Sequence, residues 1–254
     1  MIMRKAILVI DRGSREPEVL NELETICEML KKKGHYDLST YCFLEVIPPF
    51  IEEGIRKCLY DKIDYIVVMP YFLYPGMKLK ESVKQCAKLC YDMNIRALIA
   101  KPLSYHLLLQ NLIVKRVNQV KSRMNLTFEN KDCHLLVIGH GSSDKSARIA
   151  FEYTIDKLLP IFKSVDFCFL ELDNPDIQQG VRKVLRRGTG NLIVVPYFLH
   201  EGAHVKRDVR VELNSALEKY GKRDIYITTH LGSGEELVEA MVERAREVES
   251  KIVL

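Results

Sequence analysis

The sequence predicts an α/β protein built from two copies of one unit, each a four-stranded parallel sheet flanked by helices. Short apolar runs alternate along the chain with longer amphipathic stretches, and one set of motifs occurs twice in the same order. Short continuous apolar runs indicate strands buried on both faces, and strands that alternate with helices form parallel sheets. The 254 residues are enough for two domains of ordinary size.

Three motifs carry the duplication, and their copies are separated by 126 or 128 residues. Several matches in one order at nearly one separation indicate a tandem repeat with one small insertion. We therefore expect a first lobe at residues 1–121, a linker at 122–132 and a second lobe at 133–254. The repeated segments are Val-Ile-x-x-Gly-Ser at 9–14 and 137–142, Cys-Phe-Leu-Glu at 42–45 and 168–171, and Pro-Tyr-Phe-Leu at 70–73 and 196–199.

The second unit shows its elements most clearly. The run 135–138 is apolar and ends at a glycine, as a buried strand does, and the helix 205–220 is stopped by Gly221. The first unit repeats this order and closes with a helix around 107–120. Strands are expected at 135–138, 167–170, 192–198 and 225–229, and helices at 146–162, 177–185, 205–220 and 235–248.

Composition narrows the function classes. The net charge of +4 is too small to indicate a nucleic-acid-binding protein, and no apolar run reaches the roughly 18 residues of a membrane span. The first twelve residues resemble a core strand rather than a signal peptide. Seven cysteines without a Cys-x-x-Cys pair indicate buried free thiols in a reducing cytoplasm, with a metal or redox site as the alternative.

Candidate site residues follow three strands of the second unit. The first strand ends at Gly139-His140-Gly141-Ser142, the second ends at Glu171, and the third runs into the segment from His200 to His204. The carboxyl ends of parallel strands meet at one edge of a sheet, where ligands bind. Two or three imidazoles and a carboxylate at that edge suit a divalent metal ion, and the glycines allow close approach.

The first unit cannot hold the same metal site. Protonated Arg and Lys side chains do not bind cations, but they can present positive charge to an acidic ligand. Only the carboxylate is kept, because Glu45 corresponds to Glu171. At the other positions Arg12 stands for His140, Lys78 for His204 and Tyr74 for His200.

These motifs together resemble the sirohydrochlorin chelatases. The pattern consists of Gly-His-Gly-Ser at 139–142, Phe-Leu-Glu at 169–171 and Gly-x-His-Val-Lys-x-Asp at 202–208. That family includes the cobalt chelatase of cobalamin synthesis and the siroheme ferrochelatase, and a nickel chelatase is a close relative. The resemblance covers almost the whole chain. Its motifs are specific in combination, although Gly-His-Gly-Ser alone is a weak signal.

The resemblance implies a fused two-repeat lyase with two similar lobes facing a central cleft. It would insert Co²⁺ or Fe²⁺, with Ni²⁺ as a third choice, into sirohydrochlorin, without an organic cofactor, nucleic acid or membrane. A monomer suffices because of the duplication, and a dimer is compatible. Bacterial two-lobe ferrochelatases are expected to carry the histidines in the first lobe, whereas here they lie in the second. The implied catalytic residues are His140, His204 and Glu171, the metal ligands His140, His204 and His200, and the substrate-binding residues Arg12, Lys78, Ser142, Lys206 and Arg207.

Other interpretations remain open from the sequence. A neutral imidazole accepts a proton near pH 7 and can hold an incoming ion, but each histidine could also be an ordinary polar loop residue. Glu171 could be structural, and Ser142 could be a helix-capping or turn residue. A non-catalytic tetrapyrrole or metal carrier would share these residues. A phosphate-binding domain that uses helix N-termini is a third hypothesis, against which the absence of Gly-x-Gly-x-x-Gly argues.

Overall fold

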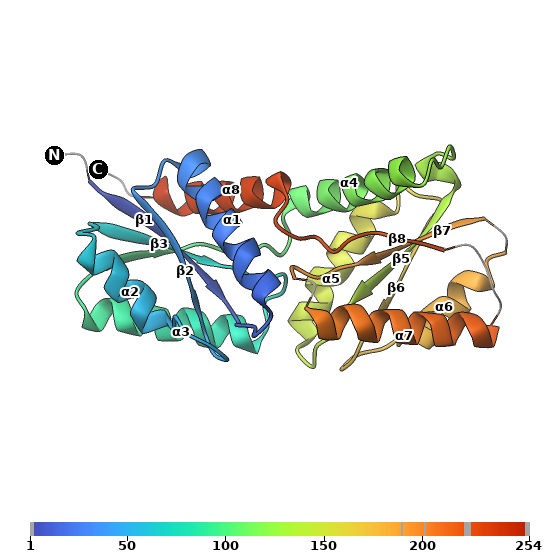
Figure 1. The fold of residues 1–254 in the computed structure, drawn as a ribbon, viewed down its shortest axis with the longest axis horizontal. Coiled ribbons are helices and arrows are strands. Elements are labelled where there is room, and N and C mark those ends of the chain that lie inside the picture. The colour runs from blue at the N-terminus through green and yellow to red at the C-terminus, as the bar shows by residue number, and fades with distance from the viewer. Residues whose placement is uncertain (1–2, 189, 201, 221–224, 252–254) are drawn as a thin grey trace. The chain divides into compact units, whose positions relative to one another are not determined.

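The computed structural model describes residues 3–188, 190–200, 202–220 and 225–251, and at 203–206 it describes the backbone only. Strands and helices alternate along the chain in the predicted order (Figure 1). The first repeat comprises β1 (Lys5–Asp11), α1 (Pro17–Gly34), β2 (Leu38–Phe43), α2 (Ile51–Tyr60), β3 (Tyr65–Pro70), α3 (Met77–Asp92), β4 (Arg96–Ile99) and α4 (Leu107–Arg123). The second comprises the short helix η1 (Asn130–Asp132), β5 (Cys133–Gly139), α5 (Lys145–Leu158), β6 (Ser164–Phe169), α6 (Ile177–Leu185), β7 (Asn191–Pro196), α7 (Ala203–Tyr220), β8 (Ile225–Ile227) and α8 (Glu235–Glu249).

Two four-stranded parallel sheets confirm the predicted fold class. Their strand orders are β2-β1-β3-β4 and β6-β5-β7-β8, so the first strand of each repeat is central. The register repeats as well, because Ile10 pairs with Cys42 and Ile138 pairs with Cys168. This topology brings the ends of β5, β6 and β7 to one edge of the second sheet, as the candidate site requires.

The sheets are buried on both faces, which explains their continuous apolar runs. Every residue of β5 is buried, and alternate side chains such as Leu136 and Ile138 pack with apolar residues of α6 and α7. Helix α6 begins in a capping box, in which the Asp176 side chain accepts from the Gln179 amide and the Gln179 side chain accepts from the Asp176 amide. The capping box therefore fixes the end of the loop before α6, which is the loop that carries Glu171.

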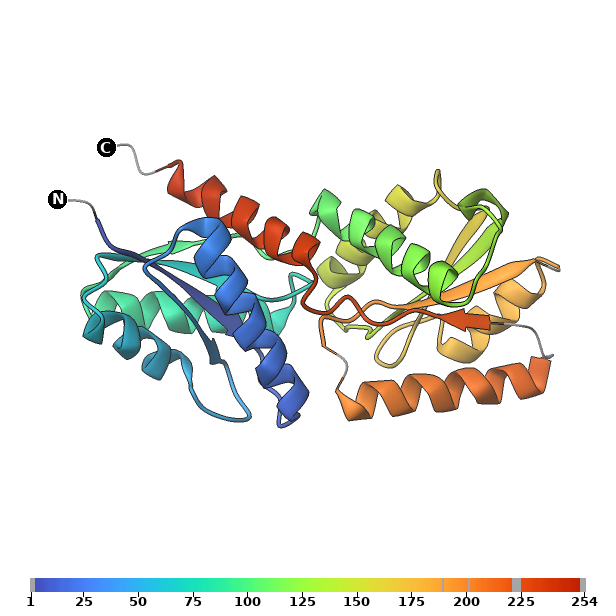
Figure 2. The same ribbon diagram turned by 45° about the horizontal axis from the view of Figure 1, so that its top comes forward.

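The compact units differ from the predicted lobes at the last helix of each repeat. One unit contains residues 1–106 and 233–254, and the other contains 107–232. Helix α8 packs beside α1 on the first sheet, and α4 packs beside α5 on the second (Figures 1 and 2). The predicted division at 122–132 therefore separates the sequence repeats but not the compact units. An apolar helix stripe shows that a helix packs on a sheet, without specifying which sheet.

An arginine on each of these helices holds the backbone of its unit. Arg244 of α8 donates to the carbonyl oxygens of Pro102 and Ser104, at 3.1 and 2.9 Å. Arg116 of α4 donates to the carbonyl oxygen of Leu231. Hydrogen bonds from a charged donor to buried carbonyls fix the segment that follows the last strand of each sheet.

The cysteines are buried thiols, as predicted. All seven are free and buried, and burial raises the pKa of Cys27 and Cys58 to about 12. The ends of some elements differ from prediction: β6 begins at Ser164 rather than at 167, and α5 ends at Leu158 rather than at 162. In the described part of the chain, no helix has both the length and the hydropathy of a membrane span.

Candidate functional site

The loop after β5 lies against the loop after β6 because residue 141 is a glycine. The amides of Leu170 and Glu171 donate to the carbonyls of Gly139 and His140, each at 2.9 Å, which continues the strand pairing past its end. Gly141 has φ 95°, and a Cβ there would lie 1.7 Å from the carbonyl oxygen of Glu171. Only glycine fits this conformation and this approach. As a result, residues 140 and 171 are held side by side.

The His140 and Glu171 side chains meet, as the sequence predicts. Nε2 of His140 lies 3.2 Å from Oε1 of Glu171, and both side chains remain partly exposed. The Phe198 ring packs edge-on to the imidazole, with 6.4 Å between centroids. A carboxylate can only accept hydrogen bonds, so Glu171 can orient the imidazole when the ring nitrogen that faces it carries the proton.

A pocket of about 380 Å³ opens beside this pair. Four carboxylates and one imidazole line it, so a divalent cation would be attracted. Among the described side chains, no group of three His, Cys, Asp or Glu residues converges closely enough to hold a metal ion. Sequence reasoning missed two of the acids, Asp176 and Glu212, which lie on a helix cap and a helix face rather than in the repeated motifs. The lining residues are His140, Leu170, Glu171, Asp176, Ile177, Gln178, Asp208 and Glu212.

Arg148 of α5 anchors the loop that carries Glu171 from behind. Its Nη1 donates to the Asp173 carboxylate at 2.7 Å and to the Asn174 carbonyl at 2.6 Å. Its guanidinium also lies over the rings of Phe167 and Phe169, at 5.6 and 5.5 Å. These contacts fix the backbone two residues beyond the candidate acid.

The first unit lacks this anchor, although its helix has the same register. The buried positions of α1 and α5 coincide when they are offset by 128 residues, for example Leu23 with Phe151. At that offset Leu20 corresponds to Arg148, and at the offset of the strand motifs Ile47 corresponds to Asp173. Both members of the contact are therefore apolar in the first repeat and charged in the second. Comparing the two repeats could have indicated from the sequence that Arg148 and Asp173 form a pair.

His200 does not line the pocket beside His140. It lines a second pocket, of about 230 Å³, together with Arg123, Arg210 and His230. Of the two histidines of the predicted trio whose side chains are described, only His140 lines the pocket beside Glu171. The predicted His204 and Lys206 have side chains outside the described residues.

Two predicted substrate-binding residues already have local partners. The Ser142 hydroxyl accepts a hydrogen bond from the Asp144 amide at 3.1 Å, which forms the turn before α5. Arg207 lies 3.2 Å from the neighbouring Asp208 carboxylate, and its side chain is exposed. These contacts assign a structural task to Ser142 and reduce the free charge at Arg207.

In the first unit the corresponding carboxylate is held between two cations. Glu45 lies 2.9 Å from Nε of Arg12 and 2.7 Å from Nζ of Lys78, the residues that stand for His140 and His204. The Lys78 ammonium, followed by the Arg12 guanidinium, lowers the pKa of Glu45 below its usual value. Gly13 allows the same close approach as Gly141, with φ 113°. The first unit therefore keeps the loop conformation of the second, but its carboxylate is paired with two cations instead of an imidazole.

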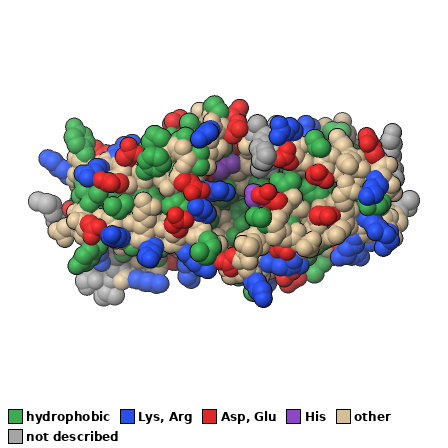
Figure 3. All heavy atoms as spheres, turned by 90° about the horizontal axis from the view of Figure 1, so that it is seen from below, with side chains coloured by type: hydrophobic (Ala, Val, Ile, Leu, Met, Phe, Trp, Pro, Cys, Tyr) green, Lys and Arg blue, Asp and Glu red, His purple; other side chains and the backbone are tan. Residues whose placement is uncertain are grey.

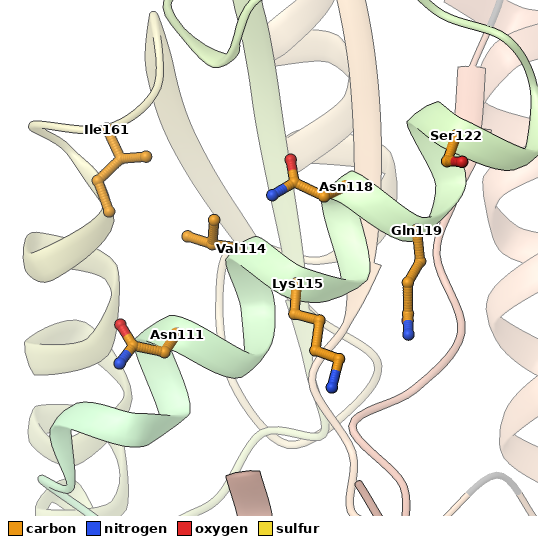
Figure 4. A pocket seen from close by; sticks show the side chains of 7 residues that line it. All are labelled: Asn111, Val114, Lys115, Asn118, Gln119, Ser122 and Ile161. Atoms are coloured by element: carbon orange, nitrogen blue, oxygen red, sulfur yellow. The ribbon is translucent and has the colours of Figure 1, made fainter. Parts of the chain in front are cut away.

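Other surface features offer less chemistry. A groove of about 610 Å³ lies along α4, but the side chains that line it include one lysine and otherwise neutral residues (Figure 4). Basic and acidic side chains are interspersed on the face shown in Figure 3, so the described surface there is mixed in charge. The groove is lined by Asn111, Val114, Lys115, Asn118, Gln119, Ser122 and Ile161.

Comparison with known proteins gives a consistent result. The CbiX family model matches the chain twice, at residues 6–120 and 134–248. A sirohydrochlorin cobaltochelatase of Priestia megaterium is 30% identical over 209 residues, which cover 80% of this chain and 67% of that protein. A sirohydrochlorin ferrochelatase of Bacillus subtilis (strain 168) is 23% identical over 250 residues, which cover 96% of this chain and 92% of that protein.

Solved structures share the fold over nearly the full length. SirB from Bacillus subtilis with Fe³⁺ superposes with a TM-score of 0.84 at 22% identity, covering 98% of each chain. SirB from the subspecies spizizenii in complex with cobalt gives a TM-score of 0.76, covering 98% of this chain and 97% of that chain. At this level of identity the likeness establishes the common two-sheet architecture.

Proposed function

The chain belongs to the CbiX family, and we propose that it is a sirohydrochlorin chelatase that inserts Co²⁺ or Fe²⁺ into the macrocycle for cobalamin or siroheme synthesis. The observation that carries the proposal is the contact of 3.2 Å between His140 and Glu171 at the carboxyl edge of the second sheet. It pairs an imidazole, which can accept a proton, with a carboxylate that can orient it.

The pair suits the proton transfer that metal insertion requires. Sirohydrochlorin loses two N–H protons as the four ring nitrogens take the ion. In the tautomer with the proton on Nε2, beside Glu171, His140 presents the Nδ1 lone pair, and we assign it the acceptance of one of these protons. The Glu171 charge then stabilises the imidazolium, in the way a buried acid supports the histidine of a catalytic triad. We assign the second proton to His204.

Incomplete ligation also suits a metal that is a substrate. The Nδ1 atom of His140 can hold the ion before insertion, and the acidic pocket beside it raises the local cation concentration. A closed site with four protein ligands would retain the ion, whereas a site with few ligands can pass it to the ring nitrogens. Because His200 lies in the other pocket, we keep His140 and His204 as the metal-handling pair.

The remaining assignments follow from charge and redox state. Arg12 and Lys78, with Lys206 and Arg207, are proposed to meet the carboxylates of the macrocycle, although Glu45 already neutralises part of the first pair. No organic cofactor takes part in the proposed reaction. The seven free thiols favour a reducing cytoplasm as its location. The relatives are named as enzymes, which favours the chelatase over a non-catalytic carrier.

Metal insertion tests the proposal. The purified protein is mixed anaerobically with sirohydrochlorin and Co²⁺, Fe²⁺ or Ni²⁺, and the absorbance change is followed beside His140→Ala and the exposed-histidine control His35→Asn. We expect insertion faster than the reaction without protein, its loss in His140→Ala and its retention in His35→Asn. Binding of the macrocycle without faster insertion would establish the carrier instead.

A further inference from the structure

The pocket that contains His200 has a composition opposite to that of its neighbour. It gathers two guanidinium groups and two imidazoles, and its described lining includes no carboxylate, whereas four carboxylates line the pocket at His140. The side chains that line it are Arg123, Pro196, Phe198, His200, Val209, Arg210, Ile227, Thr228, Thr229 and His230.

Helix α7 and Phe198 set the two pockets next to each other. Asp208 and Glu212, which are four residues apart and therefore on one helix face, line the acidic pocket, while Val209 and Arg210 line the basic one. The Phe198 ring contacts the His140 imidazole and also lines the basic pocket. A ligand centred at His140 therefore needs to extend past only one side chain to reach the basic pocket.

The basic pocket is unsuited to a metal ion. Arg123 and Arg210 are permanently charged and repel a divalent cation, so His200, which lines the same pocket, is a poor metal ligand. The same groups suit an anion. Arg123 makes one long hydrogen bond, of 3.5 Å to the Ile227 carbonyl, and Arg210 has no hydrogen bond or ion pair to another described residue. Both guanidinium groups therefore retain donors for a ligand.

We propose that this pocket is a carboxylate-binding subsite that takes one acidic side chain from the rim of the macrocycle. The inference rests on the proposed function, since sirohydrochlorin carries its carboxylates on short methylene stems a few bonds from the ring nitrogens. The apolar residues Phe198, Val209 and Ile227 can contact the stem, and the two arginines bind the carboxylate. Tyr74 and Pro102 occupy the positions of His200 and His230 in the first unit, so this subsite belongs to the histidine-bearing repeat.

Binding of metal-free sirohydrochlorin tests the subsite separately from catalysis. Its fluorescence is titrated with wild-type protein, Arg123→Ala, Arg210→Ala, the double variant and Arg210→Lys, with Arg182→Ala as a control for an arginine that stacks on Tyr220 outside the pocket. We expect Kd to rise about tenfold for each lost arginine, because a charge-assisted hydrogen bond contributes roughly that factor. Lysine should restore part of the loss, and the double variant should show a weaker dependence of Kd on salt.

A second measurement separates the subsite from the metal route. Co²⁺ binding followed by calorimetry should be unchanged in the double variant, and in the insertion assay KM for sirohydrochlorin should rise while kcat is retained. An unchanged Kd for sirohydrochlorin in the double variant, or a selective loss of Co²⁺ affinity, overturns the subsite and leaves the proposed function intact. If the wild-type protein binds no sirohydrochlorin, both proposals fail together.

Discussion

The two units place the same carboxylate on the same loop but surround it with different groups. In the first, Arg12 and Lys78 grip Glu45 directly. In the second, Glu171 contacts the His140 imidazole. The cation Arg148 binds the Asp173 carboxylate and the Asn174 carbonyl of the same loop and leaves the Glu171 carboxylate without a cationic partner among the described residues. A carboxylate that pairs with two cations, neither of which accepts protons at neutral pH, contributes to stability and does not assist a base. One that is anchored from behind keeps its charge available to a group that gains and loses protons.

Replacing His140 with the arginine found at the equivalent position of the first unit should have the largest effect on metal insertion. In His140→Arg the guanidinium can pair with Glu171 as Arg12 does with Glu45, so we expect metal insertion to fall by about 10²–10³-fold. The melting temperature should stay within about 3 °C, because the new ion pair replaces the old contact. Insertion is followed by absorbance and unfolding by calorimetry, and retained insertion would exclude His140 as the base.

The two carboxylates should respond differently to the same change. Glu171→Gln removes the charge that orients and stabilises the imidazole, and we expect insertion to fall by about 10–100-fold. Glu45→Gln should leave kcat unchanged, because its partners are not bases at neutral pH. Equal losses of kcat in both variants would mean that the two units contribute equally to the reaction and would contradict the placement of the chemistry in the second unit.

The paired glycines separate stability from activity. An alanine Cβ at 141 would meet the Glu171 carbonyl, and one at 13 would lie 2.1 Å from the Glu45 carbonyl, both at positive φ. We expect Gly13→Ala and Gly141→Ala each to lose at least about 2 kcal/mol of unfolding free energy in urea. Below the transition, only Gly141→Ala should lower kcat for insertion, whereas Gly13→Ala should affect at most KM for the macrocycle. A reduced kcat in Gly13→Ala would assign chemistry to the first unit.

Removing the rear anchor should produce a smaller loss. We expect Arg148→Ala to lower kcat a few-fold and the unfolding free energy by about 1–2 kcal/mol, because its two charge-assisted hydrogen bonds to the loop are lost. Asp173→Asn should behave similarly but more weakly, and Arg148→Lys should recover part of the activity. Glu152→Gln is the matched control, since Glu152 pairs with Arg148 within the helix and does not touch the loop. If this control loses as much activity, the helix rather than the loop contact is responsible.

The smallest expected effect is the pH dependence of the first cluster. The pKa of Glu45 is lowered in the folded protein, so its pairing stabilises the fold above the unfolded value of about 4.3 and is lost as the pH falls through the lower folded value. The melting temperature of Glu45→Gln should lie about 1–2 °C below that of the wild-type protein at pH 7, and the difference should shrink below the unfolded value and vanish below the lowered folded value. A difference that persists in acid would require a source other than this charge.

The sequence predicts the sheets and the His140–Glu171 pair well, because both depend on strong local signals. Apolar runs define buried strands, and the ends of parallel strands must share an edge. The location of His200 could not be derived, since a residue beyond a strand end has no periodic constraint on its direction. Arg148 and Arg123 were missed because each acts across elements that lie far apart in the sequence. The placement of α4 and α8 was missed for the same reason.

The exchange of these two helices constrains how such a chain can be divided. Each sheet is covered on one face by a helix encoded in the other repeat, so a single repeat lacks one helix of its own sheet. A fragment cut at the connector would leave one sheet face bare and the apolar side of one helix, with Leu237, Val238 and Met241 on α8, exposed to water. Each half, expressed alone, would therefore need the last helix of the other half to cover its sheet.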